Sequence, residues 1–208
     1  MPSIYQLKPA FQNLLRPLCR RLAAAGVTAN QVTLAAVLLS LLTGLLIAYQ
    51  APAVWPLLLL PPVLLIRMAL NAIDGMLARE HGMASSLGAI LNELGDVIAD
   101  SALWLPLAFL PGVSGSLIVG VTVLAILTEM TGVIGLQIGA SRRYDGPLGK
   151  SDRALLLGTL GLLLGLGLSA GLWLDGLLGL TLLFLAHTIY NRARQALLEI
   201  GQIPAEKL

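Results

Sequence analysis

Acidic side chains recur at helical spacing in a part of the chain that is otherwise apolar. Asp74 lies in the stretch 71–79 (NAIDGMLAR), and Glu93, Asp96 and Asp100 follow in the next apolar run. A charged side chain near the centre of a bilayer costs about 2.5–3.5 kcal/mol on insertion scales. Because several acids would carry that cost together, we expect water, a cation or both to reach them. The acidic cluster is therefore the first candidate for a functional site.

Helical spacing places the polar residues of this region on two faces. One set, spaced by four, three and four residues, shares a helix face: Arg67, Asn71, Asp74 and Ala78. A second set, spaced by fours, shares a face of the next helix: Gly88, Asn92, Asp96 and Asp100. The short connection 80–82 predicts that these helices are antiparallel neighbours, so the two faces can meet.

Small residues beside the acids favour a ligand site over two alternatives. Arg67 and Arg79 could neutralise the acids in a purely structural network, or the acids of the second helix could line a proton or cation path. Small side chains at Gly75, Ala78 and Gly88 instead leave space for a polar ligand and a hard divalent cation, which takes oxygen ligands.

Composition indicates that the elements around this cluster are membrane helices. The chain has 208 residues, of which 57% are hydrophobic and 12% charged, and its mean hydropathy is +0.85. We expect six spans, at about 31–50, 52–79, 84–110, 115–140, 154–172 and 177–191. Glycines in the fifth span predict close helix packing. A net charge of +2 gives no reason to expect nucleic acid as a partner.

The charges at the ends of the spans predict the orientation. Residues 1–27 have the pattern of an amphipathic helix on the membrane surface, divided or kinked at Pro9 and Pro17, although a basic flank that only sets orientation is an alternative. Twelve of the thirteen Lys and Arg residues fall on one side of the six-span plan. The positive-inside rule then places both termini and the acidic cluster in the cytoplasm.

The fold expected from these patterns is all-α: a polytopic membrane protein of six transmembrane helices preceded by an interfacial helix. We expect one domain over 1–208, consisting of the surface helix 1–27, the bundle 31–191 and a cytoplasmic tail 192–208.

The acidic pattern resembles a known family signature. The CDP-alcohol phosphotransferases typically contain the sequence Asp-x-x-Asp-Gly-x-x-Ala-Arg, which is followed after eight residues by Gly-x-x-x-Asp-x-x-x-Asp. This chain matches the signature at Asp74-Gly75, Ala78-Arg79, Gly88 and Asp96. It departs from the signature at Asn71 and Asn92, which replace its first and third aspartates. The resemblance covers nearly the whole chain. It is strongest to an enterobacterial branch that shares NAxDGMLARE and GAILNE.

The resemblance implies a metal-dependent transferase. It implies one or two Mg²⁺ or Mn²⁺ ions, with Asp96 as general base and these ligands: Asp74, Asn71, Asn92 and Asp96. Both amides can offer an oxygen to a hard cation but bring no charge, which favours one ion over two. It implies a CDP pocket formed by Gly75, Ala78, Arg79, Gly88 and Thr33, the last of these in a segment, 28–33, that resembles the family's segment ahead of the first span. A homodimer is expected by family analogy.

The implied reaction moves a phosphatidyl group from CDP-diacylglycerol to a polar alcohol, releases CMP and serves phospholipid biosynthesis at a bacterial inner membrane, on its cytoplasmic side. The loop 141–153 is the candidate acceptor site, because its basic residues could converge on an anionic group such as that of glycerol phosphate or inositol phosphate: Arg142, Arg143, Lys150 and Arg153. Topology or headgroup contact alone would also explain them. Three other functions are alternatives: a transferase using a soluble CDP-alcohol and diacylglycerol, a catalytically weak CDP-lipid or metal binder, and a transporter.

Overall fold

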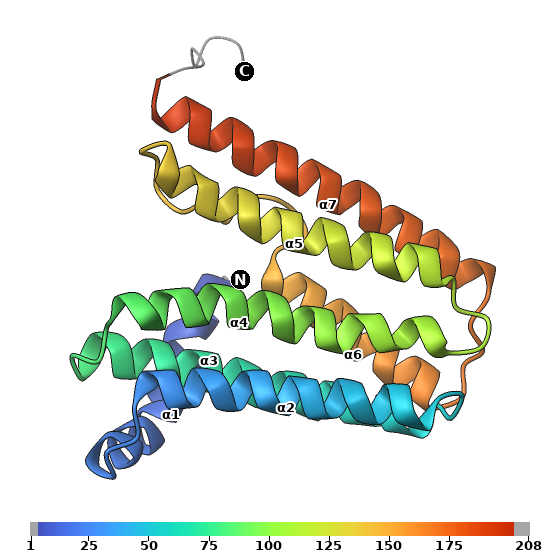
Figure 1. Cartoon of the computed structure of the whole chain (residues 1–208), viewed down its shortest axis with the longest axis horizontal. Coiled ribbons are helices and arrows are strands. Elements are labelled where there is room, and N and C mark those ends of the chain that lie inside the picture. Colours follow the sequence, from blue (N-terminus) through green and yellow to red (C-terminus); the bar gives the residue numbers. More distant parts are fainter. Residues whose placement is uncertain (1–3, 202–208) are drawn as a thin grey trace. The chain divides into compact units, whose positions relative to one another are not determined.

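Helices account for the described chain, and the all-α prediction is confirmed. The computed structural model describes the backbone of residues 4–201 and the side chains of residues 9–201, and no strand occurs in residues 4–201 (Figure 1). The elements in order are α1 (Ile4–Ala24), α2 (Ala29–Gln50), the 3₁₀ helix η1 (Trp55–Leu59), α3 (Leu60–Glu80), α4 (Ser86–Trp104), the 3₁₀ helix η2 (Leu105–Phe109), α5 (Gly115–Gln137), α6 (Lys150–Gly165) and α7 (Leu172–Glu199). Two predicted segments, 1–27 and 192–208, extend beyond the described residues.

The chain divides into two compact units. The first consists of Met1–Thr43 and Pro62–Ala102, and the second of Gly44–Pro61 and Leu103–Leu208. The acidic cluster belongs to the first unit and the basic loop to the second. The expected single domain over 1–208 stays a prediction.

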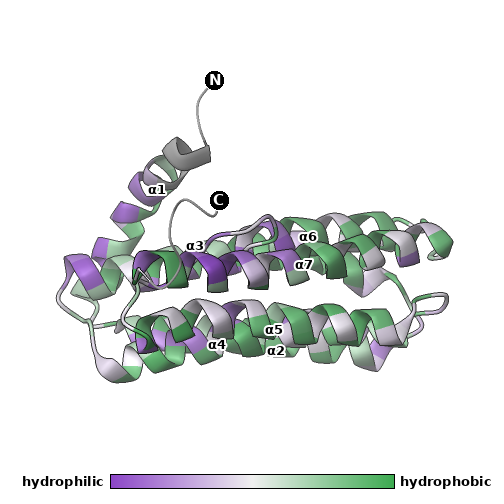
Figure 2. Cartoon of the chain, turned by 90° about the horizontal axis from the view of Figure 1, so that it is seen from above, coloured by the Kyte–Doolittle hydropathy of each residue, from purple (hydrophilic) through white to green (hydrophobic). Residues whose placement is uncertain are grey.

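Among the residues that the structure describes, four helical segments are long and apolar enough to cross a bilayer. They are Ala29–Gln50, Trp55–Glu80, Gly115–Gln137 and Leu172–Glu199, and hydrophobic residues predominate along α2 and α5 (Figure 2). α4 contains three acids. The 16 residues of α6 span only about 24 Å, which is less than the roughly 30 Å hydrocarbon core. The six-span count and the cytoplasmic termini therefore stay predictions.

The last two helices begin and end elsewhere than predicted. α6 stops at Gly165, and Gly167 at φ +96° turns the chain. α7 begins at Leu172, so Asp175 lies in its first turn and not in a turn between spans. An acid in the first turn is favourable because it faces the positive end of the helix dipole. α7 also continues to Glu199, into the segment expected to be a tail.

Prolines interrupt the helices less than predicted. α1 runs through both Pro9 and Pro17 as one helix, so the predicted division does not occur. Pro61 and Pro62 lie in the first turn of α3, where a missing backbone N–H removes no helical hydrogen bond.

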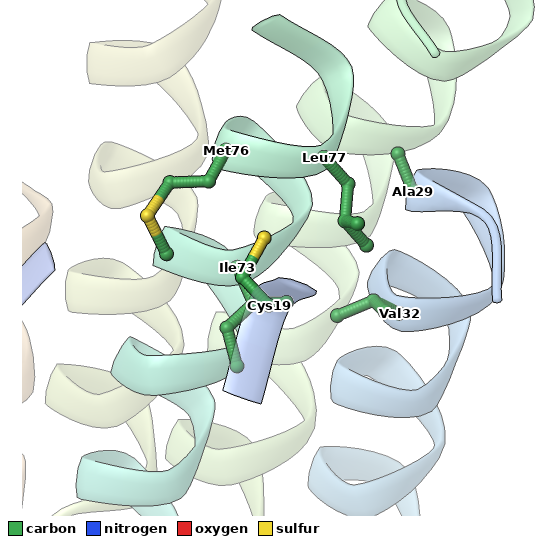
Figure 3. Packing of buried hydrophobic residues seen from close by; sticks show 6 residues of the cluster. All are labelled: Cys19, Ala29, Val32, Ile73, Met76 and Leu77. Atoms are coloured by element: carbon green, nitrogen blue, oxygen red, sulfur yellow. The ribbon is translucent and has the colours of Figure 1, made fainter. Parts of the chain in front are cut away.

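An apolar cluster packs α1 onto α2 and α3 in the first unit. Its buried members are Cys19 from α1, Ala29 and Val32 from α2, and Ile73, Met76 and Leu77 from α3 (Figure 3). With about 100° per residue, this face of α3 lies roughly 140° from the face that holds Asn71, Asp74 and Ala78. The packing thus leaves the polar face of α3 to α4.

Outside its contact with the Cys19 cluster, α1 exposes both apolar and basic side chains. Leu14 and Leu18 are 75% and 47% exposed, and the neighbouring Arg20 is exposed as well. Hydrophilic and hydrophobic stretches alternate along this helix (Figure 2). This surface suits the predicted position at a membrane interface.

Glycines allow close helix contacts in the second unit. α5 and α7 pack side by side (Figure 1), and α6 packs against η1. A Cβ atom at Gly161 would lie 2.8 Å from the carbonyl oxygen of Leu57 and from Leu60 Cβ. The predicted close packing of this glycine-rich helix is therefore confirmed.

Candidate active site

The predicted polar faces of α3 and α4 meet in the first unit. Asn71 Nδ2 donates a hydrogen bond of 3.3 Å to Asp96 Oδ1. Arg67 Nη1 lies 2.6 Å from Asp100 Oδ1, and Arg67 Nη2 donates to the backbone oxygen of Asp96 at 3.2 Å. The side chain of Arg67 is only 4% exposed. Residues spaced by four on α3 thus contact residues spaced by four on α4, as the spacing predicts.

Asp74 is buried and held by a residue of α2. Thr33 Oγ1 lies 2.9 Å from Asp74 Oδ2 and 3.1 Å from the carbonyl oxygen of Ala29. A hydroxyl has one proton, and a carboxylate is the stronger acceptor, so we assign the donated bond to Asp74. Thr33, expected in the nucleotide pocket, therefore orients a candidate metal ligand.

Two of the small residues accommodate polar side chains of the protein itself. A Cβ atom at Gly75 would lie 2.9 Å from Arg79 Nη2, so the guanidinium of Arg79 folds back over this glycine. A Cβ at Gly88 would lie 2.8 Å from Asn30 Oδ1. The space predicted beside the acids is thus lined by an arginine and an amide, while Ala78 is half-buried against the Cys19 cluster.

The donor set of this face suits a hard cation. In the part of the chain that the structure describes, no three His, Cys, Asp or Glu side chains are placed to hold a metal ion. Asn71 and Asp74 lie about one turn apart on α3, Asn92 and Asp96 lie one turn apart on α4, and Asn71 contacts Asp96 across the two helices. Carboxylate and amide oxygens are ligands for Mg²⁺ and Mn²⁺. The residues fit one such ion, with amides in place of two acids.

A buried carboxylate gathers arginines in the second unit. Glu129 of α5 lies 2.9 Å from Arg153 Nη2, 3.3 Å from Arg142 Nη2 and 3.4 Å from Arg192 Nη1. Arg153 and Arg192 are each 1% exposed. Sequence reasoning missed Arg192, because it lies outside the basic loop, at the start of the segment 192–208 that was expected to be a cytoplasmic tail. The structure brings Arg142 and Arg153 together here.

The other predicted acceptor residues lie elsewhere. Arg143 pairs with Asp145 at 2.8 Å and with Glu199 near the end of α7. The hydrogen bond that Arg143 donates to Asp145 raises the pKa of the Arg143 guanidinium. Lys150 is half-buried at the first position of α6. The structure thus brings Arg142 and Arg153 together at Glu129, and Arg143 together with Asp145 and Glu199.

The backbone of the basic loop is packed tightly between α5 and α7. A Cβ at Gly132 would lie 2.7 Å from the carbonyl oxygen of Arg143, and one at Gly135 would lie 2.9 Å from that of Ser141. Gly146 has φ +118°, and a Cβ there would lie 2.6 Å from Thr188. These three glycines fix the positions of the loop arginines.

Comparison with known proteins relates the chain to lipid enzymes. Residues 26–190 match the family model of the CDP-alcohol phosphatidyltransferases. The chain is 49% identical over 201 residues to the inner membrane protein YnbA of Escherichia coli strain K12, which covers 97% of this chain and 100% of that protein. It is 26% identical over 174 residues to the phosphatidylinositol phosphate synthase of Mycolicibacterium smegmatis, covering 81% of this chain and 75% of the enzyme.

A solved structure has the same fold. The crystal structure of Mycobacterium tuberculosis phosphatidylinositol phosphate synthase with CDP-diacylglycerol bound aligns with a TM-score of 0.69. The alignment covers 90% of this chain and 96% of that one, at 19% sequence identity.

Proposed function

Because the chain belongs to the CDP-alcohol phosphatidyltransferase family, we propose that it moves a phosphatidyl group from CDP-diacylglycerol to the hydroxyl of a polar alcohol and releases CMP. The observation that carries this proposal is the meeting of α3 and α4, where Asn71 and Arg67 of α3 contact Asp96 of α4. One relative is named a phosphatidylinositol phosphate synthase, and the similar structure contains CDP-diacylglycerol.

Asp96 is the proposed general base. When bound by the oxygens of Asp74, Asn71, Asn92 and Asp96, one Mg²⁺ or Mn²⁺ ion would neutralise charge on the diphosphate. The Asp96 carboxylate accepts the proton of the acceptor hydroxyl as its oxygen forms a bond to the phosphorus that carries diacylglycerol. The bond from this phosphorus to the bridging oxygen breaks, and CMP leaves with the electron pair.

The nucleotide half of the donor would lie beside the small residues. Gly75, Ala78 and Gly88 are the small residues proposed to line its pocket, and the Arg79 guanidinium, which lies over Gly75, can donate to diphosphate oxygens. Thr33 contributes by holding Asp74.

For the acceptor we propose a phosphorylated alcohol of the glycerol phosphate or inositol phosphate type. Arg142, Arg143, Lys150 and Arg153 are the proposed ligands. Support comes from the cluster at Glu129, where arginines are held with their planar donor groups close together, a geometry that suits phosphate. We also propose a homodimer in a bacterial inner membrane with the acidic site facing the cytoplasm, in keeping with a relative named an inner membrane protein.

The reaction can be tested with the purified full-length chain. CDP-diacylglycerol, Mg²⁺ or Mn²⁺ and a panel of serine, glycerol, inositol and the two phosphorylated alcohols would be incubated, and CMP and lipid product measured. We expect CMP and lipid in equal amounts with a phosphorylated acceptor. Asp96→Asn should slow the reaction by about 10²–10⁴-fold. Asp175→Asn, the same change in the first turn of α7, is the matched control.

Three results would contradict the proposal. Release of no CMP with any acceptor or metal would favour a catalytically weak family member that binds CDP-lipid or metal. The amides Asn71 and Asn92, which replace two acids of the family signature, are the reason to consider this alternative. Turnover only with a soluble CDP-alcohol and diacylglycerol would reverse the roles of donor and acceptor. Full activity of Asp96→Asn would remove the proposed base.

A further inference from the structure

We propose that Asn71 is a positioning residue for Asp96 and that, with Arg67, it keeps the acidic face of α4 in place whether or not a divalent cation is bound. Asn71 thus has a role of its own besides offering an oxygen to a metal. The inference rests on the proposed function only for the role of Asp96 as base.

The first step is the chemistry of the Asn71–Asp96 contact. An ionised carboxylate can only accept hydrogen bonds, so the amide nitrogen of Asn71 must be the atom that faces it. Asn71 Nδ2 lies 3.3 Å from Asp96 Oδ1. An aspartate at position 71 would instead bring two carboxylates together, and their like charges would repel each other unless a cation or a shared proton lay between them.

The second step is the contact one turn further along. Arg67 Nη1 lies 2.6 Å from Asp100 Oδ1, and its Nη2 lies 3.2 Å from the backbone oxygen of Asp96 and 3.8 Å from its Oδ1. Position 67 precedes 71 by one turn of α3, and position 100 follows 96 by one turn of α4. Two successive turns of each helix are therefore joined by contacts that need no added ion.

The third step is burial, which makes these contacts specific. Arg67 is 4% exposed, and the side chains of Asp96 and Asp100 are 19% and 15% exposed. Charges with so little access to water depend on their partners for orientation. Asp96 is therefore oriented by protein groups, and a cation is left to act on the substrate's diphosphate.

The experiment compares thermal unfolding with and without a chelator. Full-length wild type, Asn71→Asp and the exchange variant Asn71→Asp/Asp96→Asn would be heated in detergent with EDTA or with Mn²⁺. For the wild type we expect Mn²⁺ to raise the unfolding midpoint only by what its binding to the folded state contributes. For Asn71→Asp we expect EDTA to lower the midpoint by about 5 °C or more beyond its effect on the wild type, with recovery in Mn²⁺.

The exchange variant tests the hydrogen bond itself. It restores one amide and one carboxylate with their positions reversed, so EDTA should lower its midpoint no more than it lowers that of the wild type, even if Asn71→Asp alone does not fold. Asn191→Asp on α7, where the new acid faces His187, is the matched control and should behave as wild type.

Several outcomes would overturn the inference. They are a wild type that EDTA destabilises as strongly as Asn71→Asp, an Asn71→Asp variant that folds and ignores EDTA, and an exchange variant that stays dependent on Mn²⁺ or does not fold. Failure of the transferase reaction is a separate result, because a wild type that releases no CMP would leave the unfolding data unchanged.

Discussion

At the scale of single residues, Thr33 offers a test of how Asp74 is oriented. Thr33→Val keeps the shape of the side chain but removes the hydroxyl that lies 2.9 Å from Asp74 Oδ2. We expect Mn²⁺ to bind about 10–100-fold more weakly, because groups that orient a metal ligand typically contribute that much. Calorimetric titration of the purified protein measures it. Thr33→Ser, which restores the hydroxyl, should bind as wild type, and equal loss in both variants would show that the methyl group matters instead.

The basic residues of the second unit must be tested differently according to their burial. Arg153 is 1% exposed and pairs with Glu129, so Arg153→Ala should lower stability. The loss should stay below the roughly 3–5 kcal/mol of a fully unpaired buried charge, because Arg142 and Arg192 still contact Glu129. Lys150 is half-buried at a helix start. We expect Lys150→Ala to raise the acceptor KM while kcat and the unfolding midpoint stay close to wild type. An unchanged acceptor KM would indicate that Lys150 contributes only to membrane topology.

At the scale of elements, α1 is attached to α3 by the Arg16–Glu80 ion pair and by the apolar cluster around Cys19. Arg16 donates two hydrogen bonds to the carboxylate of Glu80, at 2.9 and 3.2 Å, and Cys19 is 1% exposed in the cluster. Burial raises the pKa of the Cys19 thiol, which lowers the fraction of reactive thiolate. The thiol therefore reports on detachment of α1.

We expect Cys19 to react slowly with a maleimide in the folded protein and several-fold faster in Arg16→Gln, because loss of the Glu80 pair lets α1 open more often. Mass spectrometry of timed samples measures the rate. Arg21→Gln removes the same charge from the last turn of α1 and is the control. Equal rates in all three proteins would mean that the apolar cluster alone holds the helix.

The glycines of α6 and α7 should respond in opposite directions to the same substitution. Gly161→Ala places a Cβ 2.8 Å from the Leu57 carbonyl oxygen and should destabilise the protein by about 1–3 kcal/mol. Gly179→Ala meets nothing within 4 Å and should stabilise α7 by about 0.5–1 kcal/mol. Unfolding in detergent compares the two. A neutral Gly161→Ala would show that η1 can move away from α6.

At the scale of the whole molecule, the periodicity of the sequence predicted contacts between helices that are adjacent in the chain. It did not predict contacts between residues that are far apart in the chain. The spacing of Asn71 and Asp96 on two antiparallel helices was enough to predict that their faces meet. Sequence alone did not show that Glu129 contacts Arg192 or that Thr33 contacts Asp74, because those residues lie far apart in the chain. The helix boundary expected at 177 was wrong, because α7 begins at Leu172 and aspartate, here Asp175, is well suited to the first turn of a helix.

The membrane topology depends on α4 and α6, which are not among the four apolar spans. We expect α4 to cross, because Arg67 and Asn71 compensate its acids and the apolar η2 extends it. In a Cys19→Ala background, single cysteines at Ser114 and Ser169 should react with an impermeant maleimide in intact cells. Cysteines at His81 and Tyr144 should react only after permeabilisation. If His81 and Ser114 label alike, α4 does not cross; if Tyr144 and Ser169 label alike, α6 does not. Because Arg67 lies within the expected second span, Arg67→Gln should selectively lower the fraction of molecules labelled at Ser114, through loss of the charge that makes insertion of α4 favourable.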